Sequence, residues 1–246
     1  LAAAQEAVGR GVDVARFTRE ALLAHGATVA GADTLRIDLT EAPRALRDVL
    51  GLADQTQARF TPPAEEGVLL LGRTHPVVEH LAGYVLDTAL DRELTSAAHR
   101  CGVIRTRAVS RRTTVLITRM RFHLTQRGRG PDRVLLAEEC AALAFAGAPD
   151  AAEWLDPETA EALLQARPDA NVPPDQAAEF VRRMLAGMPA LVPHLEAAAR
   201  SRAQALLAAH TRVRQAARQT HVRHEVEPHL PVDVLGVYVY LPAPTA

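Results

Sequence analysis

The most prominent chemical feature of the sequence is positive charge. Ten arginines lie between Arg100 and Arg133, and this segment holds a single acid, Asp132. The remaining residues carry 18 arginines against 28 acids, so a formal net charge of −1 hides a strongly basic segment beside an anionic body. Guanidinium groups present planar sets of donors that match phosphate oxygens. The segment therefore favours a surface that binds a nucleic-acid backbone, and the plainer interpretation is a solvated sheet face that carries arginine.

The arginines that we expect to contact phosphate lie in two strand-like segments and in the turns beside them. They are Arg105, Arg107, Arg111, Arg112, Arg119, Arg121, Arg127 and Arg129. A protein partner is the alternative, in which the same arginines pair with acids of that partner or with the chain's own acids, such as Glu138 and Glu139.

The chain contains no lysine, so all 28 strong bases are arginine. A phosphate-binding loop of the Walker type, a protein kinase and a Schiff-base enzyme each need a lysine amine. These classes are excluded for the chain by itself. We expect no catalytic residue and no cofactor within it.

Histidines offer a third and weaker possibility, a metal-dependent hydrolase. His75 and His80 flank Glu79, but zinc binding on one helical face requires a histidine spacing of four residues, and this spacing is five. A second group surrounds the expected end of a helix, where solvated or capping histidines are the better interpretation. It consists of His221, His224, Glu225 and His229. We expect no metal site.

Composition places the chain in a general class. Two cysteines, Cys101 and Cys140, are too few for a disulfide framework, and we expect both to be core thiols of a cytoplasmic protein. No apolar run approaches the ~20 residues that a membrane-spanning helix needs, so we expect no membrane partner. Leu1 to Gly11 reads as the end of a preceding segment, which suggests a C-terminal part of a larger protein.

The elements that must position the arginines are strands. Between Val115 and Leu124 apolar residues alternate with Arg119, Arg121 and His123, which predicts a half-buried strand with one cationic face. Residues 103–109 are expected to form its hairpin partner, and the turn length decides whether arginines of the two strands share a face. Residues 134–145 follow as a third segment, either strand or helix.

Helices and a closing strand complete an α+β fold, with an antiparallel sheet built from this meander and the closing strand, packed with helices that include a long helical arm. Apolar spacing and caps predict helices over 12–25, 40–51 and 74–91, further helices from 156 and 173, and a long helix from 193 to about 221, hinged near Pro189 and Pro193. Strands are expected near 35–39 and 232–241. We expect an α/β lead-in at 1–63, a helix with the basic antiparallel meander at 64–150, and the helical arm with the closing strand at 151–246, together forming one composite C-terminal domain.

Three segments in this order resemble a known family. They are Arg-Thr-His-Pro-Val-Val at 73–78, Thr-Val-Leu-Ile at 114–117 and Val-Leu-Gly-Val at 234–237. With the helical arm, they resemble the C-terminal domain of RapA-like (HepA-like) bacterial proteins, which are Snf-type, superfamily-two DNA translocases, and also the tails of helicases in DISARM-type phage defence. The resemblance spans nearly the whole chain, but none of its segments is a catalytic motif.

The resemblance implies a cytoplasmic parent protein in which an ATPase motor, using ATP and Mg²⁺, precedes Leu1. The chain would then be a non-catalytic accessory domain that binds nucleic acid, DNA first, or positions the motor through its arginine-rich sheet face. A protein-interaction module of the same helicase, without nucleic-acid contact, is the alternative. One departure concerns the helical arm: RapA has an extra long helix before its last strand, whereas this chain passes almost directly from His224 to Pro231. The RNA polymerase contacts of RapA are therefore not carried over.

Overall fold

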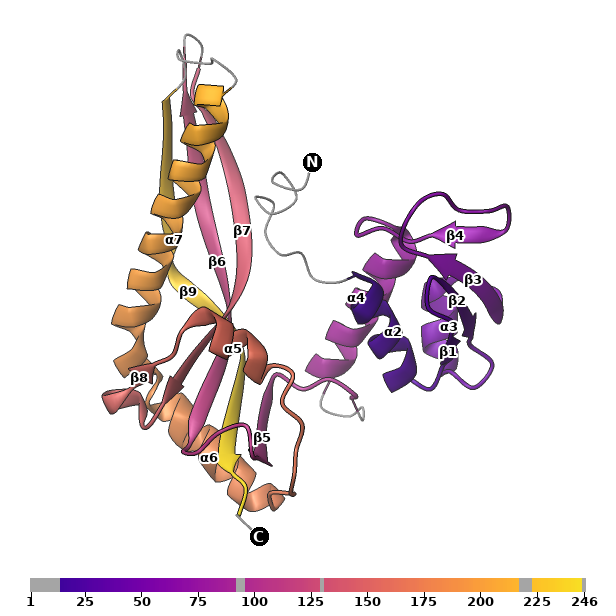
Figure 1. The fold of residues 1–246 in the computed structure, drawn as a ribbon, viewed down its shortest axis with the longest axis horizontal. Coiled ribbons are helices and arrows are strands. Elements are labelled where there is room, and N and C mark those ends of the chain that lie inside the picture. The colour runs from indigo at the N-terminus through magenta and orange to yellow at the C-terminus, as the bar shows by residue number, and fades with distance from the viewer. Residues whose placement is uncertain (1–13, 92–95, 129–130, 217–222, 245–246) are drawn as a thin grey trace. The chain divides into compact units, whose positions relative to one another are not determined.

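The chain is an α+β protein that divides into two compact units, residues 1–99 and 100–246. A computed structural model describes residues 14–91, 96–128, 131–216 and 223–244 (Figure 1). The expected boundaries at 63 and 150 do not coincide with this division, because residues 64–91 pack in the first unit and residues 101–146 share one sheet with the C-terminal strand. No helix in the described ranges is both long and apolar enough to cross a membrane.

Within its described residues, the first unit packs three helices with a small four-stranded sheet of order β1-β2-β3-β4, whose β3 and β4 pair is parallel and whose other pairs are antiparallel. Its core gathers fully buried side chains such as Leu22, Ile37, Leu46 and Leu81. The elements are α2 (Val14–Ala24), β1 (Thr28–Ala30), β2 (Thr34–Asp38), α3 (Arg44–Leu50), β3 (Gln55–Arg59), β4 (Val68–Leu70) and α4 (Pro76–Leu90).

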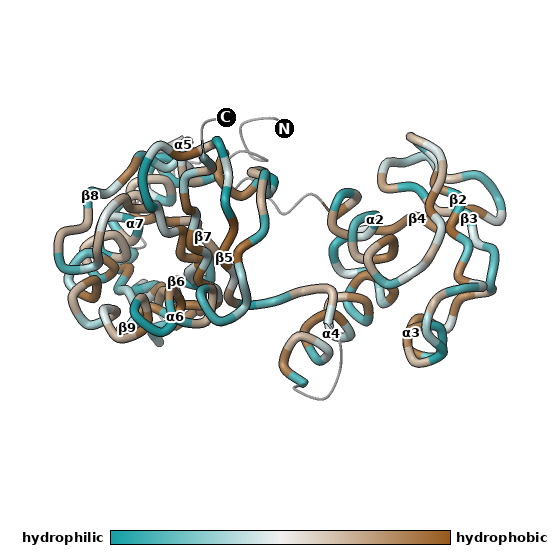
Figure 2. The backbone as a smooth tube through the Cα atoms, turned by 90° about the horizontal axis from the view of Figure 1, so that it is seen from below, coloured by the Kyte–Doolittle hydropathy of each residue, from teal (hydrophilic) through white to brown (hydrophobic). Residues whose placement is uncertain are grey.

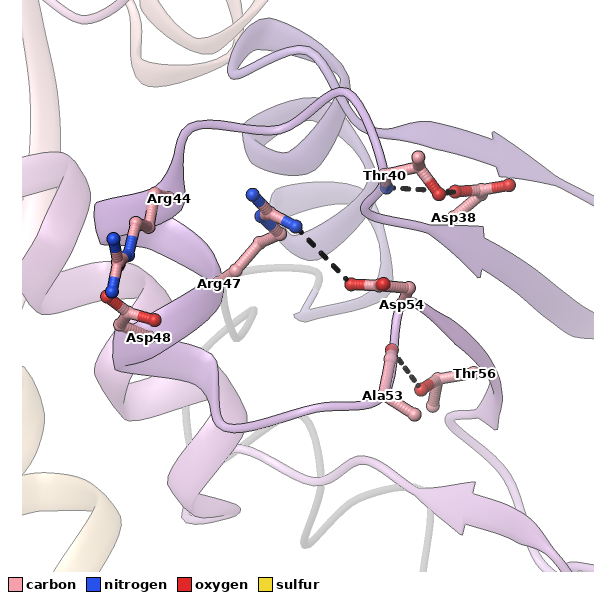
Figure 3. A network of polar contacts seen from close by, with 8 residues as sticks. All are labelled: Asp38, Thr40, Arg44, Arg47, Asp48, Ala53, Asp54 and Thr56. Carbon is pink, nitrogen blue, oxygen red and sulfur yellow. Dashed lines mark hydrogen bonds and ion pairs between the residues drawn. The ribbon is translucent and has the colours of Figure 1, made fainter.

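Polar contacts tie α3 to the sheet of this unit (Figure 3). Arg47 on α3 pairs with Asp54 just before β3 at 3.6 Å. Asp38 at the end of β2 accepts hydrogen bonds from the N–H and hydroxyl of Thr40, which lower the pKa of its carboxyl group. Asp38 and Asp54 are thus bound by residues of the same unit, so the cluster stabilises the fold of that unit.

Two helix starts in this unit differ from the sequence prediction. Helix α3 begins at Arg44 instead of Thr40, because the Thr40 side chain is bound to Asp38 and Pro43 takes the N-cap position. The N-cap of α4 is His75, one residue after the expected Thr74, and the His75 Nδ1 accepts a hydrogen bond from the Val77 N–H. His75 is therefore a capping residue.

The second unit is built on a five-stranded sheet of order β5-β9-β6-β7-β8. Strands β6, β7 and β9 are long, and helix α7 runs alongside them (Figure 1). The elements are β5 (Cys101–Thr106), β6 (Thr113–Arg127), β7 (Arg133–Ala146), a 3-10 turn η1 (Pro149–Ala151), β8 (Glu153–Trp154), α5 (Pro157–Leu163), α6 (Pro174–Ala186), α7 (Met188–Ala216) and β9 (Arg223–Pro242).

The expected hairpin between residues 103–109 and 115–124 is wrong. Strand β5 pairs in parallel with β9, and β9 lies between β5 and β6. The connection between Thr106 and Thr113 is long enough to cross over one intervening strand, since neighbouring strands are ~4.8 Å apart. The antiparallel part of the prediction is confirmed in β6, β7 and β9, and the undecided third segment is strand β7.

Helices cover the two ends of the sheet differently. Near Thr113 and Phe145, helices α6 and α7 bury one face through Leu116, Met184 and Leu191, and α5 buries the other. Toward Arg127, α7 is the helix among the described residues of this unit that covers the sheet, on the face that carries Met120 and Phe122. Hydrophobic residues are frequent along the strands of the sheet, and hydrophilic residues are frequent in the connections (Figure 2).

The expected long helix is present as α7, whose bounds are Met188 and Ala216. Pro193 lies within the first two turns of α7 and does not interrupt it, whereas the expected hinge near Pro189 coincides with the boundary between α6 and α7 at Gly187. The expected end near His221 lies outside the described residues. Both cysteines are exposed, which contradicts the expected core thiols. Cys101 is the first residue of β5, an edge strand of the sheet, and Cys140 lies on the face that no described helix covers.

Candidate interaction surface

In the structure, apolar residues and arginines of β6 point to opposite faces of the sheet, as predicted. Met120, Phe122 and Leu124 point to α7 and are almost fully buried, whereas Arg119 and Arg121 point to the other side. We call this second side the open face: the odd-numbered residues of β6 from 119 to 127, with their paired neighbours on β7 and β9. No described helix of the second unit packs on it.

The arginines of the open face are bound by acids of the same sheet. Arg119 contacts the Asp233 Oδ2 through Nε and Nη2, both at 3.0 Å. Arg121 contacts the same carboxylate through Nε at 3.2 Å and Nη2 at 3.3 Å. A register shift in β9 opposite Met120 brings Asp233 within reach of both guanidinium groups. One acid thus holds two of the predicted phosphate ligands.

The rest of the open face is balanced in the same way. Arg127 pairs with Glu225 of β9 at 2.9 Å and with Asp132 at 3.6 Å. The strand register places acids of β7 and β9 across from the basic residues, and the rings of His123 and His229 lie 5.6 Å apart. The face carries the acids Glu138, Glu225, Glu227 and Asp233 and the arginines Arg119, Arg121, Arg127 and Arg223. It is a charge-balanced surface.

The remaining predicted arginines lie away from this face. Arg111 forms a bidentate ion pair with Glu153, which lowers the pKa of that carboxyl group. Arg112 donates to the Gly147 carbonyl at 2.9 and 3.2 Å, and Arg105 donates to the Pro242 carbonyl at 3.4 Å. The side chain of Arg107 is exposed without an ion pair in the described part of the chain. Arg129 lies outside the described residues.

The candidate metal ligands are not brought together. Within the described residues, no group of three or more His, Cys, Asp or Glu side chains has the arrangement of a metal site. His224 Nδ1 lies 2.6 Å from Arg214 Nη1, and burial, together with this cation, lowers the pKa of the imidazole. His229 lies next to His123, and His221 falls outside the described residues.

The structure adds one feature that the sequence did not indicate, the outer edge of β7. Strand β8 pairs with β7 only at Phe145 and Ala146, so the edge from 133 to 143 has no strand partner among the described residues. At its start Val134, Leu135 and Leu136 are 64%, 46% and 60% exposed. The sequence signal for this exposed edge was the run of three apolar residues, Val134 to Leu136, directly after a basic turn.

The fold and this surface define a class: an α+β domain with a mixed five-stranded sheet, a charge-balanced face and an unprotected strand edge. The chain belongs to the family described as a domain of unknown function (DUF8741), whose model matches residues 88–246. That range contains the whole second unit and the end of α4. No curated protein matches the chain.

Proposed function

We propose that the chain is a non-catalytic accessory domain that acts by binding protein, with the outer edge of β7 as its interaction surface. Its setting is a larger ATP-dependent translocase of the Snf type, as the resemblance to RapA-like proteins suggests. The observation that carries the proposal is a contrast within one sheet. The arginines suited to phosphate are neutralised by Asp233 and Glu225, whereas the β7 edge offers backbone groups and apolar side chains without a described partner.

The ion pairs oppose phosphate binding for a physical reason. A phosphate must find guanidinium donors that are free to form charge-assisted hydrogen bonds. Arg119 and Arg121 would have to release Asp233, which is 28% exposed and would lose both of its counter-ions. Phosphate binding at Arg119 and Arg121 would therefore exchange existing ion pairs for new ones, with little net gain in binding free energy.

Nucleic-acid binding, with DNA as the first ligand, is the second candidate. It is favoured by Arg107 and Arg133, whose exposed side chains form no ion pair with a described residue. These two arginines lie at different ends of the sheet, directly after β5 and on β7. A site built on them would rest on few phosphate contacts.

Fluorescence anisotropy with a labelled DNA duplex, titrated from low to high salt, separates the two candidates. We expect weak binding by the 246-residue chain and no change with Arg119→Ala and Arg121→Ala together. Asp233→Asn releases both arginines, so it should tighten binding and steepen the salt dependence by about one unit for each additional phosphate that an arginine neutralises.

Asp150→Asn is the matched control, because it removes the same charge from an exposed position where no ion pair forms with a described residue. It should leave the salt dependence unchanged. Tight binding by the unmodified chain, with a salt dependence that falls in the double alanine variant, would instead establish nucleic-acid binding and overturn the proposed function.

A further inference from the structure

The backbone of β7 presents a regular row of hydrogen-bonding groups at its outer edge. The Ala144 carbonyl accepts a hydrogen bond from Leu155 N–H, so the backbone groups of Ala144 point away from β6. The pairing of β6 with β7 has no register shift, and outward-pointing groups alternate along a strand. The N–H and C=O groups that point outward therefore belong to Val134, Leu136, Glu138, Cys140 and Ala142.

This edge lacks several of the devices that normally keep sheet edges apart, and its charged residues are Arg133, Glu138 and Glu139. Between Arg133 and Ala146 the strand contains no proline, no glycine and no lysine, and its pairing with β6 shows no bulge. Val134 and Leu136 are exposed on the open face, and Leu135 is exposed on the face of α7. An edge of this length with apolar residues on both faces is suited to receive another strand.

We propose that the occupant is a second copy of this chain, with the two β7 strands paired antiparallel and Leu136 on the two-fold axis. The inference rests on the proposed function, since it names the partner of the same edge. In this register Leu136 faces Leu136, and Leu135 faces Ala137. Arg133 faces Glu139, which already accepts from Arg202 of α7 at 2.6 Å. About six backbone hydrogen bonds form across the axis.

Charge and apolar contact select this register among its neighbours. The two faces of both sheets stay aligned only when the pairing shifts by two residues, because side chains alternate between the faces. One such shift, with Leu135 on the axis, joins Leu135 to Leu135 and Val134 to Leu136, but it places Asp132 opposite Glu138 twice. The other, with Ala137 on the axis, places Leu135 opposite Glu139 and Leu136 opposite Glu138. The chosen register sets Val134 opposite Glu138 but keeps Leu136 against Leu136. Of the three registers it alone pairs Arg133 with Glu139, and it does so twice, which is why a second copy fits the edge.

Cysteine cross-linking tests the register directly. In a chain with Cys101→Ser and Cys140→Ser, Leu136→Cys places two thiols across the axis with Cα atoms ~5.5 Å apart, within disulfide range. Mild oxidation should then give a covalent dimer. Val134→Cys is the matched control on the same face, because its two copies lie about four residues apart along the strands, at ~13 Å, and should not cross-link.

Sedimentation equilibrium of the unmodified chain measures the dimer itself. We expect a concentration-dependent dimer whose dissociation constant rises at least about tenfold with Leu136→Lys, because two ammonium groups then meet at the axis. Leu185→Lys, at a 48% exposed leucine of α6, should leave the dissociation constant unchanged.

Monomers at every concentration, or equal cross-linking at positions 134 and 136, would overturn the second copy as occupant. These outcomes are separate from the DNA titration. A monomer that does not bind DNA leaves the proposed protein-binding function in place with a different partner. DNA binding that is lost with Arg119 and Arg121 removes the proposed function whether or not the chain dimerises.

Discussion

The two ends of the five-stranded sheet are covered differently by helices. At the end near Thr113 and Phe145, helices cover both faces, and four successive residues of β6, 113–116, are buried. At the end near Arg127, α7 covers one face, and burial alternates along the same strand. A strand between two layers loses its alternation, whereas a strand with one covered face keeps it.

The difference accounts for part of the positive charge of the segment, the arginines of the open face. On the open face, β6 supplies arginines because β9 and β7 supply acids opposite them, as in the Asp233 and Glu225 pairs. Three of the ten arginines in the segment, Arg119, Arg121 and Arg127, belong to a neutral cross-strand arrangement whose acids on β9 lie about 100 residues later. A basic segment is therefore weak evidence for an anionic ligand when its partner strands are distant in the sequence.

The largest effect is expected at the covered end. Phe145 is fully buried against Trp154, with ring centroids 5.1 Å apart. Phe145→Ala should destabilise the second unit by about 3–5 kcal/mol through lost burial and the cavity it leaves. Urea unfolding followed by the fluorescence of Trp154, the chain's single tryptophan, measures the change.

Leu136→Ala on the exposed edge is the control for that measurement. It removes a side chain that is 60% exposed, and the expected change is about 0.5 kcal/mol or less in the monomer. An equal loss in both variants would mean that the two ends of the sheet are not packed differently.

An intermediate effect is expected at the open face. Asp233→Asn leaves Arg119 and Arg121 without their shared counter-ion, and we expect a loss of about 1–2 kcal/mol, reduced from the cost of a buried pair because all three groups are partly exposed. The same unfolding experiment checks it. Glu196→Gln, which breaks a surface pair of α7 with Arg200, should cost only about 0.3–0.5 kcal/mol. A value for Asp233 as small as this would show that the ion pairs do not hold the open face together.

Periodicity predicted what depends on nearby residues. The alternation in β6, the helix α2 and the long helix α7 follow from apolar spacing within one element, and the structure confirms them. Strand β3 was missed because the sequence Gln-Thr-Gln at 55–57 carries no apolar alternation, and its place in the sheet comes from pairing with β2.

Features set by distant residues could not be predicted in this way. Strands β5 and β6 are neighbours in the sequence and were expected to form a hairpin, but the insertion of β9 between them depends on pairing with residues more than 100 positions away. For the same reason the acid that binds Arg119 and Arg121 was not foreseen. The prediction that β6 has one apolar and one cationic face was correct. The acids that neutralise the cationic face lie on β9 and could not be assigned to it from the sequence.

The smallest effect is expected for His194 at the covered end of the sheet, whose ring stacks on the ring of Trp154. The His194 ring of α7 lies parallel to Trp154, with centroids 3.7 Å apart, and partial burial lowers the pKa of the imidazole below its ordinary value of about 6.5. The unfolded chain then binds a proton more readily than the folded chain, so this contribution to stability is present above pH 6.5 and is lost as the pH falls toward the folded pKa. The fluorescence of Trp154 should titrate with a midpoint below 6.5, and His194→Gln should abolish the transition. A midpoint above 6.5 would mean that attraction between the imidazolium and the indole ring outweighs the effect of burial.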